Sequence, residues 1–420
     1  MLNKKLPGMK NNFITILLIL VSVFQLNTCK TSDPDFPERQ GKKIEVSTED
    51  ELHLAVLNAV PDATILIRDG VYNLKRPLLI ENKSHITICG ASNDSARVII
   101  KGDGWADFYS KERRENDPSD LIIIRNSEDI FIADITFKEV SHYGIKLDTE
   151  SKAAKSAISN INVFRCHFMN IATRAFKGTA TKDRSHLTGG SVKSCIFENT
   201  LIPDTSWLYN GDYISAIDMM YLDSWTFSDN IFRNYKGANG GGRGAIFIWN
   251  QSRNIVVERN VFIGCDRSIA FGNPSEPTNY EPGTLHNYDG IIRNNFITGG
   301  YKEGKGIEIV WADNIRVYNN TIWSYDTNYP AIHYFQKINR LSLSNNLVRG
   351  NIYGEGNEVI PEANLSGLLE GYFTDPEKGD LHLTEHAKEA IGKGIKLQDL
   401  KDDIDRQKRK PNPDIGADQR

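Results

Sequence analysis

The sequence predicts an all-β chain wound into a parallel β-helix, a solenoid whose coils are sets of short strands. Two alternating patterns predict this fold. The first is an apolar strand, as in residues 245–249 (AIFIW), and the second places an Asn before apolar residues, as in residues 259–262 (RNVF). Each pattern returns about every 25 to 40 residues, which is the period of a solenoid. No amphipathic helical segments separate the copies, so a fold of alternating strands and helices is not expected.

Alignment of the copies predicts which side chains point into the solenoid. Successive side chains of a strand alternate between two faces, so residues two apart share a face. Two inward columns result, one running from Ile145 to Ile332 and the other from Leu147 to Tyr334. In the second pattern, amides stacked at a bend are expected to hydrogen-bond from coil to coil. That column is Asp134, Cys166, Cys195, Asn230, Asn260, Asn295, Asn320 and Asn346.

The first 29 residues read as a secretory signal. A basic residue, Lys10, precedes an apolar run at 13–24, which is the order of a signal peptide and is too short for a membrane span. Cys29 follows the run and is the predicted lipidation site, which makes the chain an outer-membrane lipoprotein of a Gram-negative bacterium. The tract at 30–35 resembles the export signal of Bacteroidetes-type lipoproteins. The alternative is plain secretion or a periplasmic location.

The mature chain divides into three predicted parts. Residues 30–46 are a polar tether, 47–354 form the β-helix and 355–420 form an irregular C-terminal cap. A helix is expected over 47–60, because Ser47-Thr48 precede acidic residues and apolar side chains at helical spacing, and it would cover the open end of the first coil. Strands are expected at 64–67, 78–80, 86–88, 98–100, 121–124 and 130–132, and loops on one side at 183–190, 202–213, 235–242 and 273–288.

Composition narrows the kinds of partner. The net charge of −4 and the pI near 6.2 disfavour nucleic acid, whose binding proteins carry a basic face. The other four cysteines show no CxxC spacing and are expected to be buried. They are Cys89, Cys166, Cys195 and Cys265.

A candidate site lies on the outward face of the apolar strands. One outward column reads Lys146, Lys177, Asp218, Phe247, Ala270, Glu308 and His333, and the next includes Trp249. Coils lie about 4.8 Å apart, so Lys177 is expected to contact Asp218, and Glu308 to contact His333. The rings of Phe247 and Trp249 are a candidate platform for a sugar. The alternatives are surface ion pairs for the charged residues and a lid over the solenoid for Trp249.

Residues 60–420 resemble the bacterial right-handed parallel β-helix proteins that include polysaccharide lyases of the alginate and chondroitin type. Segments 244–250, 257–260, 265–272 and 413–418 carry the resemblance. It implies β-elimination at a uronic acid, with a Lys and an Arg moving protons and a Ca²⁺ held by Asn and Glu neutralising the carboxylate. Carried over, Lys177 is the base and Arg243 or Arg267 its partner. The chain lacks an Asn-Gly-Asn-Glu motif, so Ca²⁺ is left open and an Arg is the alternative.

The predicted activity is that of a carbon–oxygen lyase giving a 4,5-unsaturated uronate, either by chain cleavage or by loss of water at a terminal uronate, as an oligosaccharide dehydratase. Arg174, Arg243 and Arg267 precede apolar strands and are expected at the cleft rim, while Glu308 is expected to orient His333. The predicted catalytic residues are Lys177, His333, Arg243, Arg267 and Glu308, and the predicted substrate-binding residues are Asp218, Phe247, Trp249, Asn250, Lys146, Trp311 and Tyr334.

Two other functions compete with the lyase. A non-catalytic glycan-binding lipoprotein would use Trp249, Phe247 and Trp311. A β-helix glycoside hydrolase is disfavoured, because Asp218 and Glu308 lie three coils apart, roughly 14 Å, whereas such enzymes need two carboxylates about 5 to 9.5 Å apart.

Overall fold

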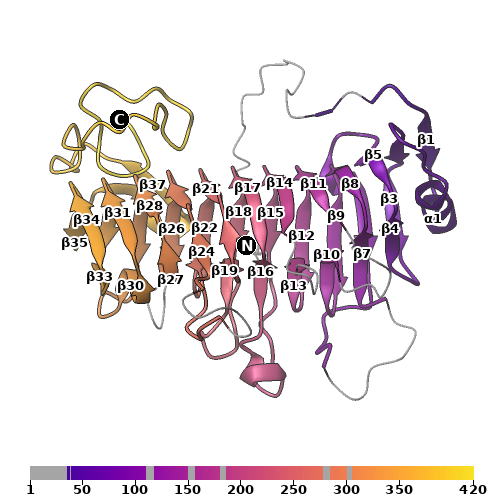
Figure 1. Cartoon of the computed structure of the whole chain (residues 1–420), viewed down its shortest axis with the longest axis horizontal. Coiled ribbons are helices and arrows are strands. Elements are labelled where there is room, and N and C mark those ends of the chain that lie inside the picture. Colours follow the sequence, from indigo (N-terminus) through magenta and orange to yellow (C-terminus); the bar gives the residue numbers. More distant parts are fainter. Residues whose placement is uncertain are drawn as a thin grey trace, which may run out of the picture. The chain divides into compact units, whose positions relative to one another are not determined.

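The chain winds into a right-handed parallel β-helix, as predicted (Figure 1). The computed structural model describes residues 36–37, 39–109, 118–149, 157–179, 186–277, 284–299 and 305–420. Residues 39–420 form one unit. The predicted signal peptide and Cys29 lie outside the described residues. Within those residues, no helix has the length and apolar character needed to cross a membrane.

Each full coil contributes one strand to each of three parallel ladders. The first ladder carries the apolar pattern of residues 245–249. Its strands are β4 (Leu78–Glu81), β7 (Asp120–Arg125), β10 (Tyr143–Asp148), β13 (Arg174–Thr179), β16 (Ser215–Met220), β19 (Gly244–Trp249), β23 (Ile269–Phe271), β27 (Ile307–Asp313), β30 (Pro330–Ile338) and β33 (Asn351–Gly354).

The second ladder includes three of the six strands expected near the start of the chain, those at 64–67, 86–88 and 130–132. Two short strands, β20 (Ser252–Arg253) and β24 (Asn287–Tyr288), link it to the first ladder. Its strands are β1 (Lys43–Val46), β2 (Thr64–Ile67), β5 (Ser84–Gly90), β8 (Glu128–Ala133), β11 (Ser159–Phe164), β14 (Leu187–Lys193), β17 (Leu222–Ser228), β21 (Val256–Glu258), β25 (Ile291–Arg293), β28 (Ile315–Tyr318), β31 (Arg340–Ser344) and β34 (Glu358–Glu362).

The third ladder closes the coil. Its strands are β3 (Gly70–Asn73), β6 (Val98–Lys101), β9 (Thr136–Val140), β12 (His167–Ile171), β15 (Ile196–Glu198), β18 (Ile231–Arg233), β22 (Val261–Cys265), β26 (Phe296–Gly299), β29 (Thr321–Ser324), β32 (Leu347–Arg349) and β35 (Leu365–Gly367).

The predicted columns are confirmed residue by residue. The inward residues Ile145, Phe176, Ile217, Ile246, Ile269, Ile307 and Ile332 are register partners from coil to coil and are fully buried. On the third ladder, five Phe rings stack through the core with centroids 4.7 to 5.0 Å apart, close to the coil spacing. They are Phe137, Phe168, Phe197, Phe232 and Phe262. The four described cysteines are buried and free.

The asparagine ladder is also confirmed. The side-chain oxygen of Asn260 accepts from the backbone N–H and the side-chain amide of Asn230, both at 3.0 Å, and the same pair of bonds repeats from Asn260 to Asn295 and onward to Asn364. The residue before each ladder Asn is left-handed, as at Arg259 with φ 51°. This conformation turns the chain from the second ladder into the third, and the ladder satisfies the backbone groups that the turn exposes.

The first coil carries a short helix, α1 (Glu49–Leu57), over the predicted segment. Thr48 is its N-cap and accepts from the backbone N–H of Glu51. The buried side chains of Leu52 and Val56 belong to the same core as the strands.

The C-terminal part begins later than predicted. The parallel coils continue through β34 and β35 to Gly367, because these strands still pair with β31 and β32. Beyond them lie an antiparallel hairpin of β36 (Phe373–Asp375) and β37 (Asp380–Leu383), with η3 (Pro376–Lys378) in its turn. The final segment packs back on the coils, where the backbone N–H of Ala417 donates to Thr321 at 2.9 Å.

The connections differ at the two edges of the coils. The C-terminal segment lies over one edge, and the segment carrying η2 (Leu208–Gly211) projects from the other (Figure 1). The predicted loop 183–190 is only partly a loop, because β14 already starts at Leu187. A further short 3₁₀ helix, η1 (Ser95–Arg97), precedes β6.

Candidate functional site

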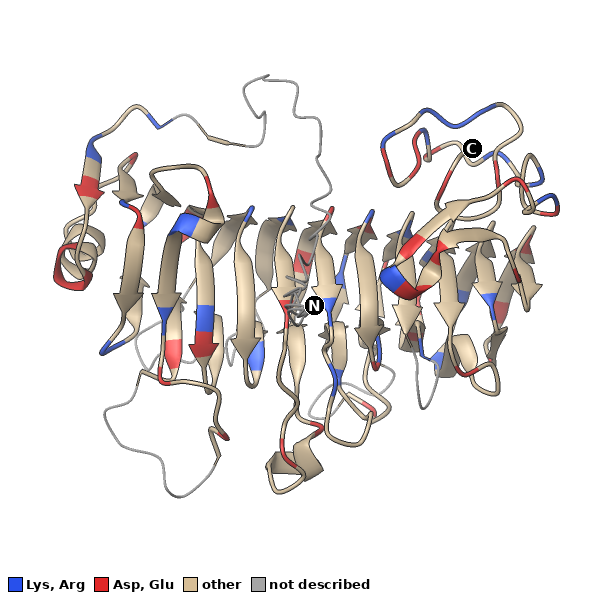
Figure 2. Ribbon diagram, turned by 180° about the vertical axis from the view of Figure 1, so that it is seen from behind, with Lys and Arg blue, Asp and Glu red and all other residues tan. Residues whose placement is uncertain are grey.

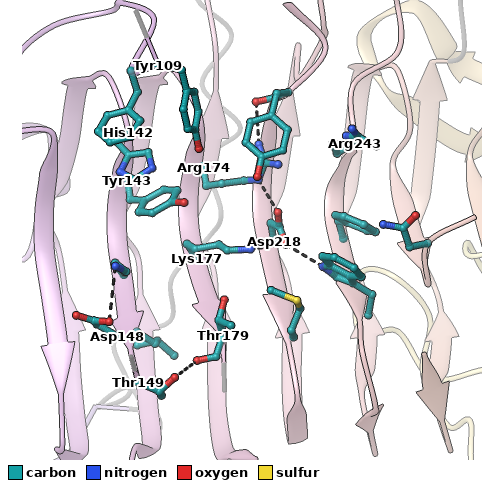
Figure 3. Close-up of a pocket in the computed structure, with 18 of the residues that line it drawn as sticks. Tyr109, His142, Tyr143, Asp148, Thr149, Arg174, Lys177, Thr179, Asp218 and Arg243 are labelled. Carbon is teal, nitrogen blue, oxygen red and sulfur yellow. Dashed lines mark hydrogen bonds and ion pairs between the residues drawn. The ribbon is translucent and has the colours of Figure 1, made fainter. Parts of the chain in front are cut away.

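A pocket of about 610 Å³ lies on the outward face of the first ladder, between β10 and β19 (Figure 3). Its floor comes from the predicted outward columns. Two segments outside the ladders, 104–109 and 202–213, supply its walls. The floor includes Lys146, Asp148, Arg174, Lys177, Thr179, Asp218, Met220, Phe247 and Trp249, and the walls and rim include Phe108, Tyr109, His142, Tyr143, Tyr209, Tyr213 and Arg243.

An ion cluster around Asp218 anchors the floor. Asp218 is 2% exposed and accepts from Lys177 Nζ at 2.9 Å, so the predicted contact is confirmed. Its other oxygen accepts from Arg174 Nε at 2.6 Å. Trp249 adds a third donor, its indole N–H at 3.1 Å. Burial alone would raise the pKa of Asp218, but Lys177 and Arg174 outweigh it and hold that pKa well below its usual range.

Arg174 is itself buried and fixed. Its side chain is 1% exposed, and its Nη1 donates to the backbone carbonyls of Thr173 at 2.8 Å and Tyr213 at 2.9 Å. The guanidinium carbon lies 4.1 Å from the centre of the Tyr213 ring, a cation–π contact. Arg174 therefore holds the wall segment at Tyr213 against the floor at Asp218.

Two lysines stand side by side on the floor. Lys146 and Lys177 are register partners on the neighbouring strands β10 and β13. Lys146 lies 3.6 Å from Asp148, whose carboxylate also binds Arg125 at 2.6 Å. With Arg174 and Arg125, the two lysines make four cations around the two carboxylates of Asp218 and Asp148, so the cluster carries net positive charge.

Tyr143 begins strand β10, and His142 immediately precedes it. His142 Nδ1 lies 2.8 Å from Asp120, and its ring stacks between Phe108 and Tyr143 with centroids 3.4 and 3.5 Å away. Burial raises the pKa of the Tyr143 phenol. The same cause, with the neighbouring Tyr213, raises the pKa of Tyr109 to about 12. Both phenols are therefore protonated at neutral pH.

Aromatic contacts join the two wall segments across the ladder. Trp105 lies 5.6 Å from Trp207, and Tyr109 lies 5.8 Å from Tyr213. Arg243 stands at the far end, with its guanidinium 5.0 Å above the Tyr209 ring. Among the described residues it has no carboxylate within ion-pair distance. Arg243 is thus a pocket cation available to an anionic ligand.

The predicted aromatic platform is partly corrected. Phe247 and Trp249 stack with centroids 5.3 Å apart and nearly parallel planes. Phe247 is only 3% exposed, because the neighbouring indole covers it. Both rings line the pocket, but Trp249 is the half-buried one that a sugar can contact, and the almost fully buried Phe247 packs against it.

The remaining predicted residues lie outside this pocket. Arg267 and Lys305 flank the fully buried Glu308 at 3.0 and 3.3 Å, three coils from Asp218. His333 is the register partner of Glu308, but no hydrogen bond joins these two described side chains. Tyr334 packs against the core. Asn250 donates to Met220 Sδ at 3.0 Å, and neither Asn250 nor Trp311 lines the pocket.

The residues of the pocket wall were not predicted from the sequence. Tyr109, Tyr209 and Tyr213 lie in segments with no counterpart in other coils, so no column reveals them. His142 and Tyr143 could have been found from the sequence. Tyr143 is the register partner of Arg174, so the alignment of coils already placed it beside a residue predicted at the cleft rim. Arg174 was expected at the rim and instead lies within the floor cluster.

The pocket does not fit the Ca²⁺ that the resemblance implies. Ca²⁺ takes about six to eight oxygen ligands. The carboxylates lining the pocket are Asp148 and Asp218, and each is already bound by two cationic side chains. Side-chain cations are therefore the groups that this site offers to an anion.

Comparisons with known proteins show the fold and no closer relationship. No sequence family matches the chain, and no curated protein sequence does. An alginate lyase from Paenibacillus sp. str. FPU-7 is 16% identical, with 77% of this chain and 97% of that one covered and a TM-score of 0.52. Pectate lyase Pel9A is 12% identical, with 90% and 96% covered and a TM-score of 0.56.

A third neighbour is not described as a lyase. It is a variant tailspike protein of E. coli bacteriophage HK620 in complex with a pentasaccharide, 15% identical, with 78% of this chain and 59% of that chain covered and a TM-score of 0.50. The predicted likeness to β-helix polysaccharide lyases is thus confirmed as a likeness of fold, and the chain shares the architecture of such lyases.

Proposed function

We propose that the chain is a carbon–oxygen lyase that acts by β-elimination at a uronic acid residue of an acidic glycan. The observation that carries the proposal is the convergence, in one pocket, of a lysine pair with an Asp-held histidine and a buried phenol. β-Elimination needs three functions: neutralisation of the carboxylate, a base for the C5 proton and an acid for the oxygen leaving C4.

The lysine pair neutralises the carboxylate. Lys146 and Lys177 present adjacent ammonium groups on a rigid sheet. Once the substrate carboxylate is bound there, the C5 proton becomes more acidic, because the charge that develops on removing it is stabilised. Lys177 is a poor base in this setting, since the Asp218 carboxylate 2.9 Å away favours its charged form.

His142 and Tyr143 move the protons. Asp120 binds His142 at Nδ1, which sets the tautomer and makes Nε2 the basic nitrogen. His142 Nε2 takes the C5 proton, the electron pair of that bond forms the C4–C5 double bond, and the C4–O bond breaks. The Tyr143 phenol, held protonated by burial, gives its proton to the leaving oxygen, and Tyr109 beside it can restore that proton from solvent.

The leaving oxygen defines two outcomes. If it belongs to the next sugar, the glycan chain is cleaved. If it is the hydroxyl of a non-reducing terminal uronate, the same elimination releases water and the chain acts as an oligosaccharide dehydratase. Arg243, at the far end of the pocket, would bind an acidic group on a neighbouring sugar.

A substrate panel tests the proposal. The purified chain is incubated with alginate, pectin, glycosaminoglycan and ulvan fragments, and the ultraviolet absorbance of the conjugated double bond is followed. Mass spectrometry of a positive reaction separates loss of water from chain scission. Absence of an unsaturated product across the panel, with binding retained, would overturn the lyase in favour of a non-catalytic glycan-binding protein.

A further inference from the structure

A second cavity, of about 490 Å³, lies between the C-terminal segment and the coils. Residues 395–398, 400–401, 408–411 and 413 form its outer wall, and Asn319 and Asn345 of the coils form its base. Figure 2 shows Lys and Arg interspersed with Asp and Glu along this C-terminal segment, and the residues that line the cavity are the basic ones. A volume of this size lies in the range of ligand sites, roughly 300 to 1,000 Å³.

The lining of the cavity is one-sided in charge. Five cations line it, and no acidic or aromatic side chain does; the cations are Lys396, Lys401, Lys408, Arg409 and Lys410. Lys396, Lys401 and Lys408 are exposed, and none of these three has a carboxylate within ion-pair distance among the described residues. Such a cluster around a concave site attracts anions.

Nearby carboxylates are turned away from the cavity. Asp403 accepts from the backbone N–H groups of Gln407 at 2.7 Å and Gln419 at 3.1 Å. Asp414 accepts in the same way from Gly392 at 2.7 Å and Arg420 at 2.8 Å. These acids hold the C-terminal segment together, and Asp399 binds Arg316 and Tyr318 of the coils instead of a cavity lysine.

The cavity is held open by bonds between its walls. Asn345 donates to the backbone carbonyl of Ile395 at 2.8 Å and accepts from its N–H at 2.9 Å. Arg409, half-buried in the outer wall, donates to Asn294 at 2.7 Å and to the carbonyl of Gly416 at 3.0 Å. A ligand therefore meets a preformed site and binds without ordering it.

We propose that this cavity is an accessory binding site for an acidic glycan chain, separate from the elimination pocket. It offers cations without the phenols and imidazole of that pocket, so it binds and does not catalyse. The exposed lysines of the cavity recognise charge and not the shape of a sugar ring, which suits a chain carrying repeated carboxylate or sulfate groups. The choice of a glycan over a small anion rests on the proposed function.

The test removes two exposed charges from the cavity in the full chain. The background is Tyr143→Phe, so that the glycan is not consumed. Lys401→Gln/Lys408→Gln is compared with Lys42→Gln/Lys75→Gln, which removes two exposed lysine charges at the other end of the solenoid. Titration calorimetry with alginate and chondroitin sulfate is expected to show binding about three- to tenfold weaker for the cavity variant alone. Dextran, which is neutral, is expected not to bind there.

Each of the other outcomes counts against the accessory site or against a glycan as its ligand. An unchanged Kd, or an equal loss in both double variants, overturns the accessory site. Lost binding of inorganic sulfate with unchanged glycan binding makes the cavity a small-anion site and overturns the glycan assignment. Turnover is measured separately, in the chain with Tyr143 intact. If that chain turns over a glycan but the cavity substitutions do not weaken binding, this inference alone fails. If the substitutions weaken binding but no glycan is turned over, the proposed lyase alone fails.

Discussion

Two ion clusters on the first ladder follow the same design three coils apart. Around Asp218 stand Lys177 and Arg174, and around Glu308 stand Arg267 and Lys305. Each has one buried carboxylate bound by two cations. The first lies in a pocket of about 610 Å³, and the second lines none of the described pockets.

The difference arises outside the ladder. Segments 104–109 and 202–213 stand beside the first cluster and bring Tyr109 and Tyr213. Tyr143, the first residue of β10, and His142 before it complete this side of the pocket. The first cluster therefore faces several proton-transfer groups within a pocket, whereas the second has His333 beside it and lines none of the described pockets. A buried ion cluster alone is a structural feature of the solenoid. The added wall segments make the cluster around Asp218 part of a candidate active site.

The largest expected contrast is in turnover. Tyr143→Phe removes the proposed acid while keeping the ring, and we expect kcat/KM to fall by about 10²- to 10⁴-fold. His333→Ala, beside the second cluster, is expected to change kcat/KM by no more than about twofold. Initial rates of unsaturated product on the best glycan measure both. A comparable loss in His333→Ala would return the catalytic role to the second cluster.

In stability the two clusters should behave alike. Asp218→Asn and Glu308→Gln each leave two cations around a neutral group, and breaking a buried pair costs about 3–5 kcal/mol. Urea unfolding of both variants and wild type provides the measurement. Glu45→Gln, at an exposed pair with Arg68, is the control and should unfold with wild type. If Asp218→Asn unfolds with wild type as well, its ion cluster does not stabilise the fold.

A smaller effect is the pH dependence of the Asp218 contribution. Its pKa in the folded chain lies below the unfolded value of about 3.9. The stability it gives is therefore complete above about pH 4 and is lost as pH falls through the folded pKa. The difference in unfolding free energy between wild type and Asp218→Asn should be constant from pH 7 to about 5 and shrink only below about 4. A difference that shrinks near pH 6 would contradict the depressed pKa.

The same comparison shows what sequence could and could not predict. The coil pitch is fixed by backbone hydrogen bonding, so alignment of repeats was sufficient to place Lys177 against Asp218 and to predict the asparagine ladder. The walls do not repeat, so Tyr109 and Tyr213 had no column to reveal them. The C-terminal boundary was predicted a coil early, because residues 358–367 pair as strands without the apolar signature of earlier coils. Coil spacing also predicted the gap between Asp218 and Glu308, which argued against a hydrolase.

The smallest predicted effect isolates the third donor to Asp218. Trp249→Phe keeps an aromatic ring beside Phe247 but removes the indole N–H that lies 3.1 Å from the carboxylate. Because Arg174 and Lys177 still satisfy Asp218, we expect a loss of about 1 kcal/mol in unfolding free energy. If the indole face also stacks on a sugar, KM rises severalfold while kcat changes little.

Trp311→Phe is the matched control, because Trp311 does not line the pocket. It should leave KM unchanged. An equal rise of KM in both variants would contradict direct contact between the Trp249 ring and the sugar. Because Trp311 lies outside the pocket, a rise common to both variants would reflect a general change of the fold. A rise confined to Trp249→Phe assigns the sugar platform to that single indole, with Phe247 as its buried support.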